Sequence, residues 1–200
     1  MNPTIRLAND ADCVRIAAIY APYVINTAIS FENEPPGADE IRHRVRETLN
    51  FLPWLVCSFG DLVAGYAYAD KFRTRAAYQW SCTVSVYVDS ELHRAGVGRA
   101  LYTSLFKILE LQGFYNLFAG ITLPNQPSVE LHRSFDFQQI AIERSVGYKL
   151  GRWHDVSMWQ KSLRHYQSNP EAVESIRSLA NSDPWQSAIS AGLRFIRRSS

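Results

Sequence analysis

A strand followed by a glycine-containing loop and an amphipathic helix constrains the fold of this chain more than any other segment. Residues 78–88 are rich in β-branched and aromatic side chains, which favour a β-strand. A helix then begins at Gly96-Val-Gly98 and ends at Gly113. Backbone N–H groups at a helix start are unpaired and lie at the positive end of the helix dipole, so this loop predicts an anion site. A plain tight turn fits two glycines at least as well.

The remaining pattern predicts a mixed α/β plan. Strand-like runs cover residues 4–7, 54–59, 62–69, 117–123, 139–148 and 154–160. Apolar residues at helical spacing follow Asn9 or Asp10, either of which can cap the first predicted helix. Two more helices are predicted over residues 39–49 and 128–135. Because two helices precede three consecutive strands, the order does not fit a regular βαβ repeat.

The composition changes near the C-terminal end. Ser, Asn, Pro and Glu dominate residues 168–182, and the chain ends on a short basic stretch. We therefore expect a catalytic domain over residues 1–164 and an extension over residues 165–200. This extension is interpreted as one or two marginal helices outside the catalytic core, with a solvated end.

Charge and cysteine usage exclude several classes of protein. Lys plus Arg number 21 and Asp plus Glu 19, so a net charge of +2 gives no case for nucleic acid or an anionic membrane as partner. No apolar run is long enough for a transmembrane helix. The three cysteines are far apart, which argues against a disulfide framework or a zinc site. We expect no metal and a cytoplasmic enzyme.

A second stretch carries more specific chemistry. Pro124-Asn125-Gln126-Pro127 follows a predicted strand, and a short helix follows in turn. Asn125 and His132 are seven residues apart, which places both side chains on one side of that helix, about two turns apart. On its own, His132 would be interpreted as a half-buried core residue.

Together these segments resemble the GCN5-related N-acetyltransferase superfamily. Its loop motif, Gln/Arg-x-x-Gly-x-Gly/Ala, stands here as His93-Arg-Ala-Gly96-Val-Gly98. Further motifs are similar to phosphinothricin N-acetyltransferases: Ser30-Phe-Glu, Gly65-Tyr-Ala-Tyr-Ala, Tyr78-Gln-Trp, Ser85-Val-Tyr-Val, Leu123-Pro-Asn and Val146-Gly-Tyr-Lys. The resemblance spans about residues 5–163. It implies an α/β fold with a central, mixed and mostly antiparallel sheet, flanked by helices, with splayed central strands.

The resemblance implies acetyl-CoA as co-substrate and assigns residues to it. The backbone of Val86, Tyr87 and Val88 would pair with the pantetheine arm. The pyrophosphate would lie against the loop formed by His93, Arg94, Ala95, Gly96, Val97 and Gly98. Asn125 and Ser128 would contact the coenzyme arm. His132 stands where many members carry a tyrosine that protonates the leaving thiolate.

The resemblance also implies a small-molecule amine acceptor and a homodimer. The acceptor pocket would be formed by Phe31, Arg73, Arg75, Tyr78 and Lys149. Basic side chains in loops are otherwise most often solvated charges, and Lys149 could equally be an exposed cation at a hairpin turn. Glu32, near the expected acceptor, is otherwise interpreted as a surface carboxylate.

Three positions depart from the family pattern. His93 replaces Gln or Arg at the start of the loop motif, and Asp136 stands where a helix-ending glycine is usual. The most consequential is Thr83, which occupies the position of the strand glutamate that removes the amine proton. A threonine hydroxyl cannot act as a base near neutral pH.

We therefore consider three hypotheses for the function. The first is N-acetylation of a small amino acid of the phosphinothricin or methionine-sulfoximine type. The second is a coenzyme A-binding protein with weak or lost catalysis, which Thr83 favours. A protein or peptide acetyltransferase of the same fold is the third.

Overall fold

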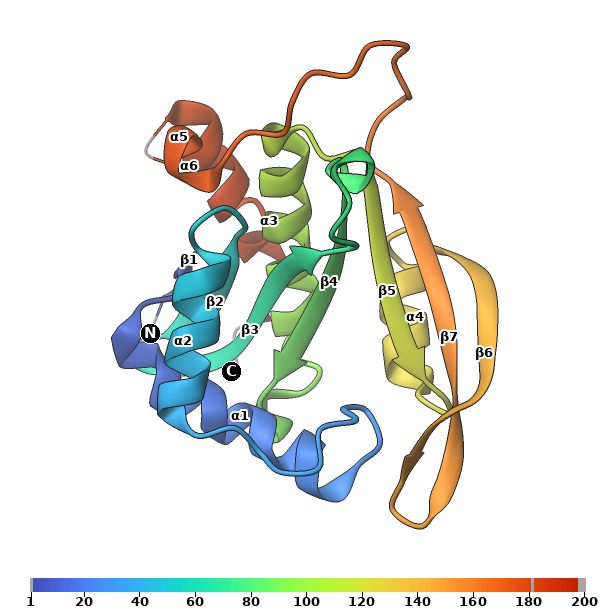
Figure 1. The fold of residues 1–200 in the computed structure, drawn as a ribbon. Helices are drawn as coiled ribbons and strands as arrows, with labels where there is room; N and C mark the ends of the chain where they lie inside the picture. Colours follow the sequence, from blue (N-terminus) through green and yellow to red (C-terminus); the bar gives the residue numbers. More distant parts are fainter. Residues whose placement is uncertain (1, 181, 198–200) are drawn as a thin grey trace.

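The computed structural model describes residues 2–180 and 182–197. Seven strands form one sheet in the order β1-β2-β3-β4-β5-β7-β6 (Figure 1). Their bounds are β1 Pro3–Leu7, β2 Trp54–Phe59, β3 Leu62–Lys71, β4 Ser81–Val88, β5 Asn116–Thr122, β6 Gln138–Lys149 and β7 Arg152–Ser162. Only β4 and β5 run parallel, and every other neighbouring pair is antiparallel. The expected mixed, mostly antiparallel sheet is confirmed.

Helices cover both faces of the sheet. Their bounds are α1 Cys13–Asn26, α2 Ala38–Thr48, α3 Val97–Gln112, α4 Gln126–Arg133, α5 Ile176–Leu179 and α6 Asp183–Ser190. One core joins α1 and α2 to the face that carries Trp54 and Tyr66. A larger core joins α3 to the opposite face, where alternating small residues such as Ala67 and Ala69 let the helix approach. The sheet therefore has a hydrophobic core on each face, one under α1 and α2 and one under α3.

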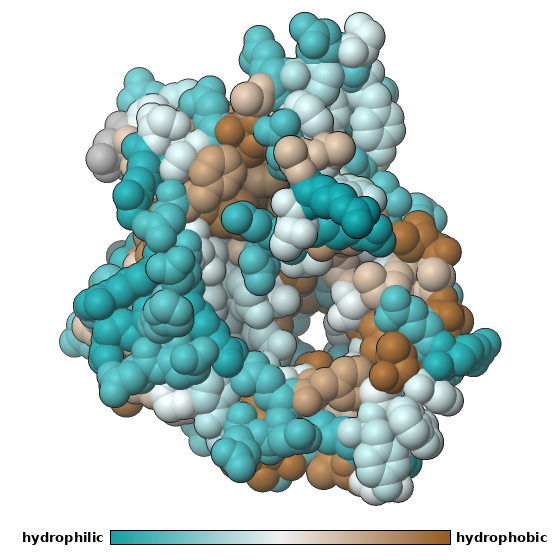
Figure 2. Space-filling model, viewed as in Figure 1, coloured by the Kyte–Doolittle hydropathy of each residue, from teal (hydrophilic) through white to brown (hydrophobic). Residues whose placement is uncertain are grey.

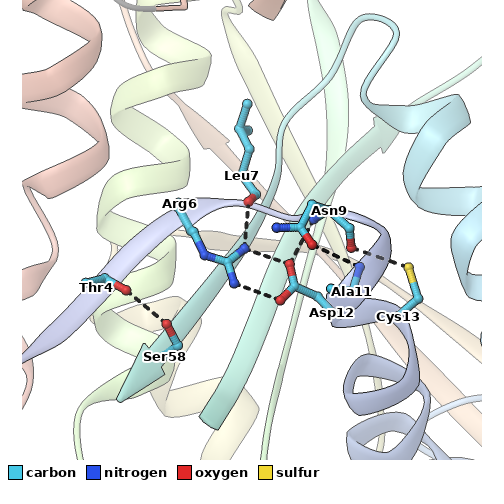
Figure 3. A network of polar contacts seen from close by, with 8 residues as sticks. All are labelled: Thr4, Arg6, Leu7, Asn9, Ala11, Asp12, Cys13 and Ser58. Carbon is cyan, nitrogen blue, oxygen red and sulfur yellow. Dashed lines mark hydrogen bonds and ion pairs between the residues drawn. The ribbon is translucent and has the colours of Figure 1, made fainter. Parts of the chain in front are cut away.

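The link between β1 and α1 is held by an ion pair at the start of the helix (Figure 3). The two terminal guanidinium nitrogens of Arg6 donate to the Asp12 carboxylate, at 2.6 and 2.8 Å. Asn9 caps the turn by accepting from the N–H of Ala11, while its own N–H donates to Asp12. The predicted cap at Asn9 is therefore confirmed, and its partner Asp12 lies buried beneath the junction.

The boundaries predicted from sequence differ from the structure by a few residues. Residues 76–78 form a turn closed by the Tyr78 N–H on the Arg75 carbonyl, so β4 begins at Ser81 rather than Tyr78. The short helix expected over residues 128–135 is Gln126–Arg133. Its end is followed by Asp136 at φ 63°, the left-handed conformation in which the family pattern places glycine.

The C-terminal extension is part of the packed structure. Ile176, Trp185 and Ala188 are buried in the same core as α3. The N–H of Gly192 donates to the hydroxyl of Ser104, and that hydroxyl donates to the Ile189 carbonyl. The expectation of marginal helices is met by α5 and α6, but their apolar faces complete the core instead of lying apart from it. Within residues 2–180 and 182–197, no helix is long and apolar enough to cross a membrane.

Candidate functional site

The sheet opens between β4 and β5. The two strands are paired only through Ser81, Cys82 and Thr83, and they diverge beyond Thr83 and its neighbour Phe118. Figure 2 shows an opening through the molecule at the place where Figure 1 shows this divergence. The resulting edge of β4 leaves backbone groups without a neighbouring strand. The Asp89 N–H donates to the Ala64 carbonyl on β3. Backbone groups of successive residues in a strand point to opposite edges, and Val86 is three residues before Asp89. The N–H and C=O of Val86 therefore point away from β3, towards the opening.

The loop before α3 exposes a row of unpaired backbone donors. Gly96 has φ 84°, which brings the chain into the helix, and the first helical bond is donated by Ala100 to Gly96. The N–H groups of Val97, Gly98 and Arg99 therefore precede the first helical bond and point out of the helix start. A positive helix dipole and free donors are the groups that bind phosphate in proteins, and the role of this loop as the pyrophosphate site stays a prediction.

Gly98 connects this loop to the opening. A Cβ at Gly98 would lie 3.5 Å from a methyl of Val88 and 3.8 Å from a methyl of Leu131 on α4. A side chain at position 98 would thus point between β4 and α4. An extended ligand that places phosphate on the loop would continue between these two elements, along the edge of β4.

Two residues of the expected coenzyme site already have partners. The Val88 carbonyl accepts from the Tyr23 hydroxyl at 2.6 Å. His93 is exposed, and its Nε2 lies 3.1 Å from the same hydroxyl. These contacts fix the start of the loop against α1. Val86, one residue of β4 whose backbone is turned to the opening, lies between this fixed end and the last pairing with β5 at Thr83.

His132 lies buried between α4 and α3. Its Nδ1 lies 2.8 Å from the Ser128 carbonyl, so the nitrogen carries hydrogen and donates, and Nε2 accepts from the Tyr102 hydroxyl at 3.2 Å. Asn125 caps the same helix by accepting from the Ser128 N–H. Burial lowers the pKa of His132, and the bond to Ser128 offsets this only in part. The role of His132 as acid for the leaving thiolate stays a prediction.

We predict that the neutral state of His132 makes stability depend on pH. Because burial lowers the folded-state pKa, the unfolded chain binds a proton more readily at this site, and stability is lost as pH falls through the unfolded value of about 6.5. His132→Gln removes the titrating group. Thermal melts between pH 8 and pH 5 should show a smaller loss for this variant than for the wild type. Equal losses would contradict the assignment, and exposed His43→Gln serves as control.

A cavity of about 630 Å³ lies on the α1 and α2 side of the sheet, reaching Asp70 next to Thr83. It is lined by Tyr20, Arg44, Trp54, Tyr66, Tyr68 and Asp70, among others. The indole N–H of Trp54 is buried and has no acceptor among the described residues. Arg44 donates to both oxygens of Glu32, at 2.8 and 3.2 Å. A buried donor without an acceptor favours an occupant that carries an anionic or carbonyl oxygen.

The residues expected in the acceptor pocket do not line this cavity. Phe31 packs against Gly147, and Arg73 lies over the rings of Phe72 and Tyr78. The ammonium of Lys149 is buried and donates to the Val24 and Ser30 carbonyls, at 2.6 and 2.7 Å. Lys149 therefore anchors the loop after α1, and its donors are directed to the chain itself.

Arg75 is exposed at the turn before β4 and has no carboxylate partner among residues 2–180 and 182–197. Sequence reasoning missed Trp54, Arg44 and Asp70, because their place in the cavity depends on strand register and helix packing. The alternation of β3, Tyr66-Ala-Tyr68-Ala-Asp70, was the one signal that they share a face.

Comparisons with known proteins agree with this geometry. The family model described as "Acetyltransferase (GNAT) domain" matches residues 5–159. A phosphinothricin N-acetyltransferase of Streptomyces viridochromogenes is 39% identical over 159 residues, covering 80% of this chain and 87% of that protein. An L-methionine sulfoximine/L-methionine sulfone acetyltransferase of Salmonella typhimurium is 32% identical, covering 84% of this chain and 99% of that protein.

A solved structure shows the same fold with a ligand. It is a GNAT superfamily phosphinothricin acetyltransferase from Sinorhizobium meliloti in complex with acetyl-CoA. The two superimpose with a TM-score of 0.81 at 32% identity, covering 86% of this chain and 94% of the other. The matched part includes the loop before α3, the opening between β4 and β5, and the cavity beside it.

Proposed function

This chain belongs to the GNAT acetyltransferase family and is an acetyl-CoA-dependent N-acetyltransferase; we propose that its acceptor is a small amino acid of the phosphinothricin or methionine-sulfoximine type. The observation that carries the proposal is the position of the cavity. It extends to Asp70, the β3 partner of Thr83, and Thr83 is the last β4 residue paired with β5, so an acceptor at this end of the cavity lies close to the open edge of β4. The relatives that act on such amino acids match four fifths or more of this chain.

The chain's own groups suit this chemistry. The loop before α3 binds the phosphates of acetyl-CoA, which supplies an activated acetyl thioester along the β4 edge. A backbone N–H at Val86 is placed to polarise the thioester oxygen as the amine attacks. Trp54 in the cavity, and the exposed cation Arg75 at the turn before β4, offer donors to the carboxylate and second polar group of the acceptor.

An acceptor panel tests the proposal. Thiol release from acetyl-CoA is measured with phosphinothricin, methionine sulfoximine, methionine sulfone, polyamines and peptides with a free N-terminus. We expect the amino acid analogues to have the highest kcat/KM. Preference for peptides or polyamines would reject the acceptor class. Coenzyme A binding without turnover of any amine would support the alternative of a binding protein, which Thr83 favours.

We also propose a cytoplasmic homodimer. Its three cysteines are free and buried, as suits a reducing compartment. The outer strand β6 exposes Ile140, Val146 and Tyr148, with exposed fractions of 51%, 51% and 60%. Such an apolar edge supports pairing with a second copy. Sedimentation equilibrium of the purified protein decides between one and two copies.

A further inference from the structure

Given the proposed function, on which this inference rests, we propose that the Asp70 carboxylate takes the proton of the acceptor amine. It would do so from β3, through a water molecule, in place of the β4 glutamate whose position is occupied here by Thr83. The general base would thus lie on β3 instead of β4, at the position paired directly with Thr83.

The register of the sheet places Asp70 beside Thr83. The two residues are direct partners in the antiparallel pair of β3 and β4. Directly opposed residues point their side chains to the same face, with Cβ atoms about 4.5–5.5 Å apart. The Thr83 hydroxyl donates to the backbone carbonyl of Asp70 at 3.3 Å, which holds the two residues together.

This pair lies at the point where the sheet opens. Thr83 is the last β4 residue paired with β5, so the edge that can receive the thioester begins one residue further on. The ring of Phe118, the β5 partner of Thr83, stacks on the ring of Phe72. A water molecule between Asp70 and Thr83 would therefore face the cavity on one side and the open β4 edge on the other.

The Asp70 carboxylate has a free oxygen for this task. One oxygen accepts from the Lys71 N–H at 2.7 Å, which orients the group. Among the residues that the structure describes, no cation forms an ion pair with Asp70. Its side chain lines the cavity from the strand.

The other titratable groups that line the cavity, and Glu32, which bonds to two of its lining residues, are less suited to the task. Glu32 accepts from Arg44 and Tyr20, and the bonds from Arg44 hold its pKa below the ordinary value. Glu47 and His43 belong to α2, on the wall opposite the strands. The remaining titratable or charged groups that line the cavity are Tyr20, Arg44, Tyr66, Tyr68 and Lys71. None of these is a carboxylate on the strands beside Thr83.

The proton balance is complete without another reactant. The acceptor ammonium gives one proton to the water held by Asp70, and the neutral nitrogen forms a C–N bond with the thioester carbon. The C–S bond breaks, the thiolate takes one proton, and the second nitrogen proton leaves. The net reaction converts ammonium and acetyl thioester to amide, thiol and one proton, which solvent receives.

Asp70→Asn tests the proposal, because asparagine keeps the acceptor for the Lys71 N–H. General-base assistance contributes about 10²–10⁴ in rate, so kcat/KM at pH 7 should fall by about 100-fold or more. The deficit should shrink as pH rises towards the pKa of the amine, since an amine that is already neutral needs no base. Adding Thr83→Glu to Asp70→Asn should recover at least tenfold at pH 7.

Controls separate the possible outcomes. Asp61→Asn, in the turn between β2 and β3, should leave turnover unchanged. Wild-type turnover with acetyl-CoA tests the proposed function by itself, before any variant is compared. The inference is overturned if Asp70→Asn retains wild-type rates at pH 7. It is also overturned if Asp70→Asn lowers the rate equally at every pH, or if Glu47→Gln shows the pH-dependent loss instead.

Discussion

Gly98→Val is expected to weaken coenzyme A binding by about 100-fold or more, which corresponds to about 2.7 kcal/mol. A Cβ at this position makes only ordinary contacts, with Val88 at 3.5 Å and Leu131 at 3.8 Å. The two methyl groups of valine extend further between β4 and α4. They would occupy the space that the coenzyme arm needs between the phosphate loop and the open edge.

Titration calorimetry with coenzyme A measures this effect on protein shown to be folded by its thermal melt. Gly98→Ala is the matched variant, because it adds the Cβ alone and should cost much less affinity. Gly37→Ala, where nothing lies within 4 Å, controls for the general effect of replacing a glycine. Wild-type affinity in Gly98→Val would place the coenzyme elsewhere.

Trp185→Ala should lower the free energy of unfolding by about 3–5 kcal/mol, the usual cost of removing a buried large aromatic side chain. Trp185 is 4% exposed and belongs to the core shared by α3 and the sheet. The expected result follows from the extension being part of the folded domain. Denaturant unfolding measures it directly.

Trp185→Ala should also affect the loop before α3, which is proposed to bind the coenzyme. Arg197 donates its N–H to the Ala95 carbonyl at 2.9 Å, and the Phe195 carbonyl occupies the place where Gly96 would carry a Cβ. Displacing the extension therefore removes a brace from the loop. Val14→Ala, at a site 65% exposed, should change stability by less than about 0.5 kcal/mol. A similarly small change for Trp185→Ala would instead support a catalytic domain that ends at residue 164, with the extension outside its core.

Local sequence patterns predicted the order of the elements, and they predicted that the loop proposed to bind the coenzyme lies at the start of a helix. Alternation and helical spacing are properties of neighbouring residues, so strands such as Trp54–Phe59 and the helix ending at Gly113 could be predicted within a few residues. The phosphate loop is equally local, because its donors come from consecutive backbone groups at one helix start. These features need no knowledge of distant contacts.

Tertiary structure alone decided the acceptor side. Asp70 faces Thr83 only because β3 and β4 pair in one particular register, which the intervening turn does not reveal. Lys149 was predicted in the acceptor pocket, yet its ammonium is bound by carbonyls more than a hundred residues away. Likewise, the polar composition of the extension concealed Ile176 and Trp185, since a few apolar side chains complete a core when a groove beside α3 receives them. Burial of a side chain depends on what the rest of the chain places over it.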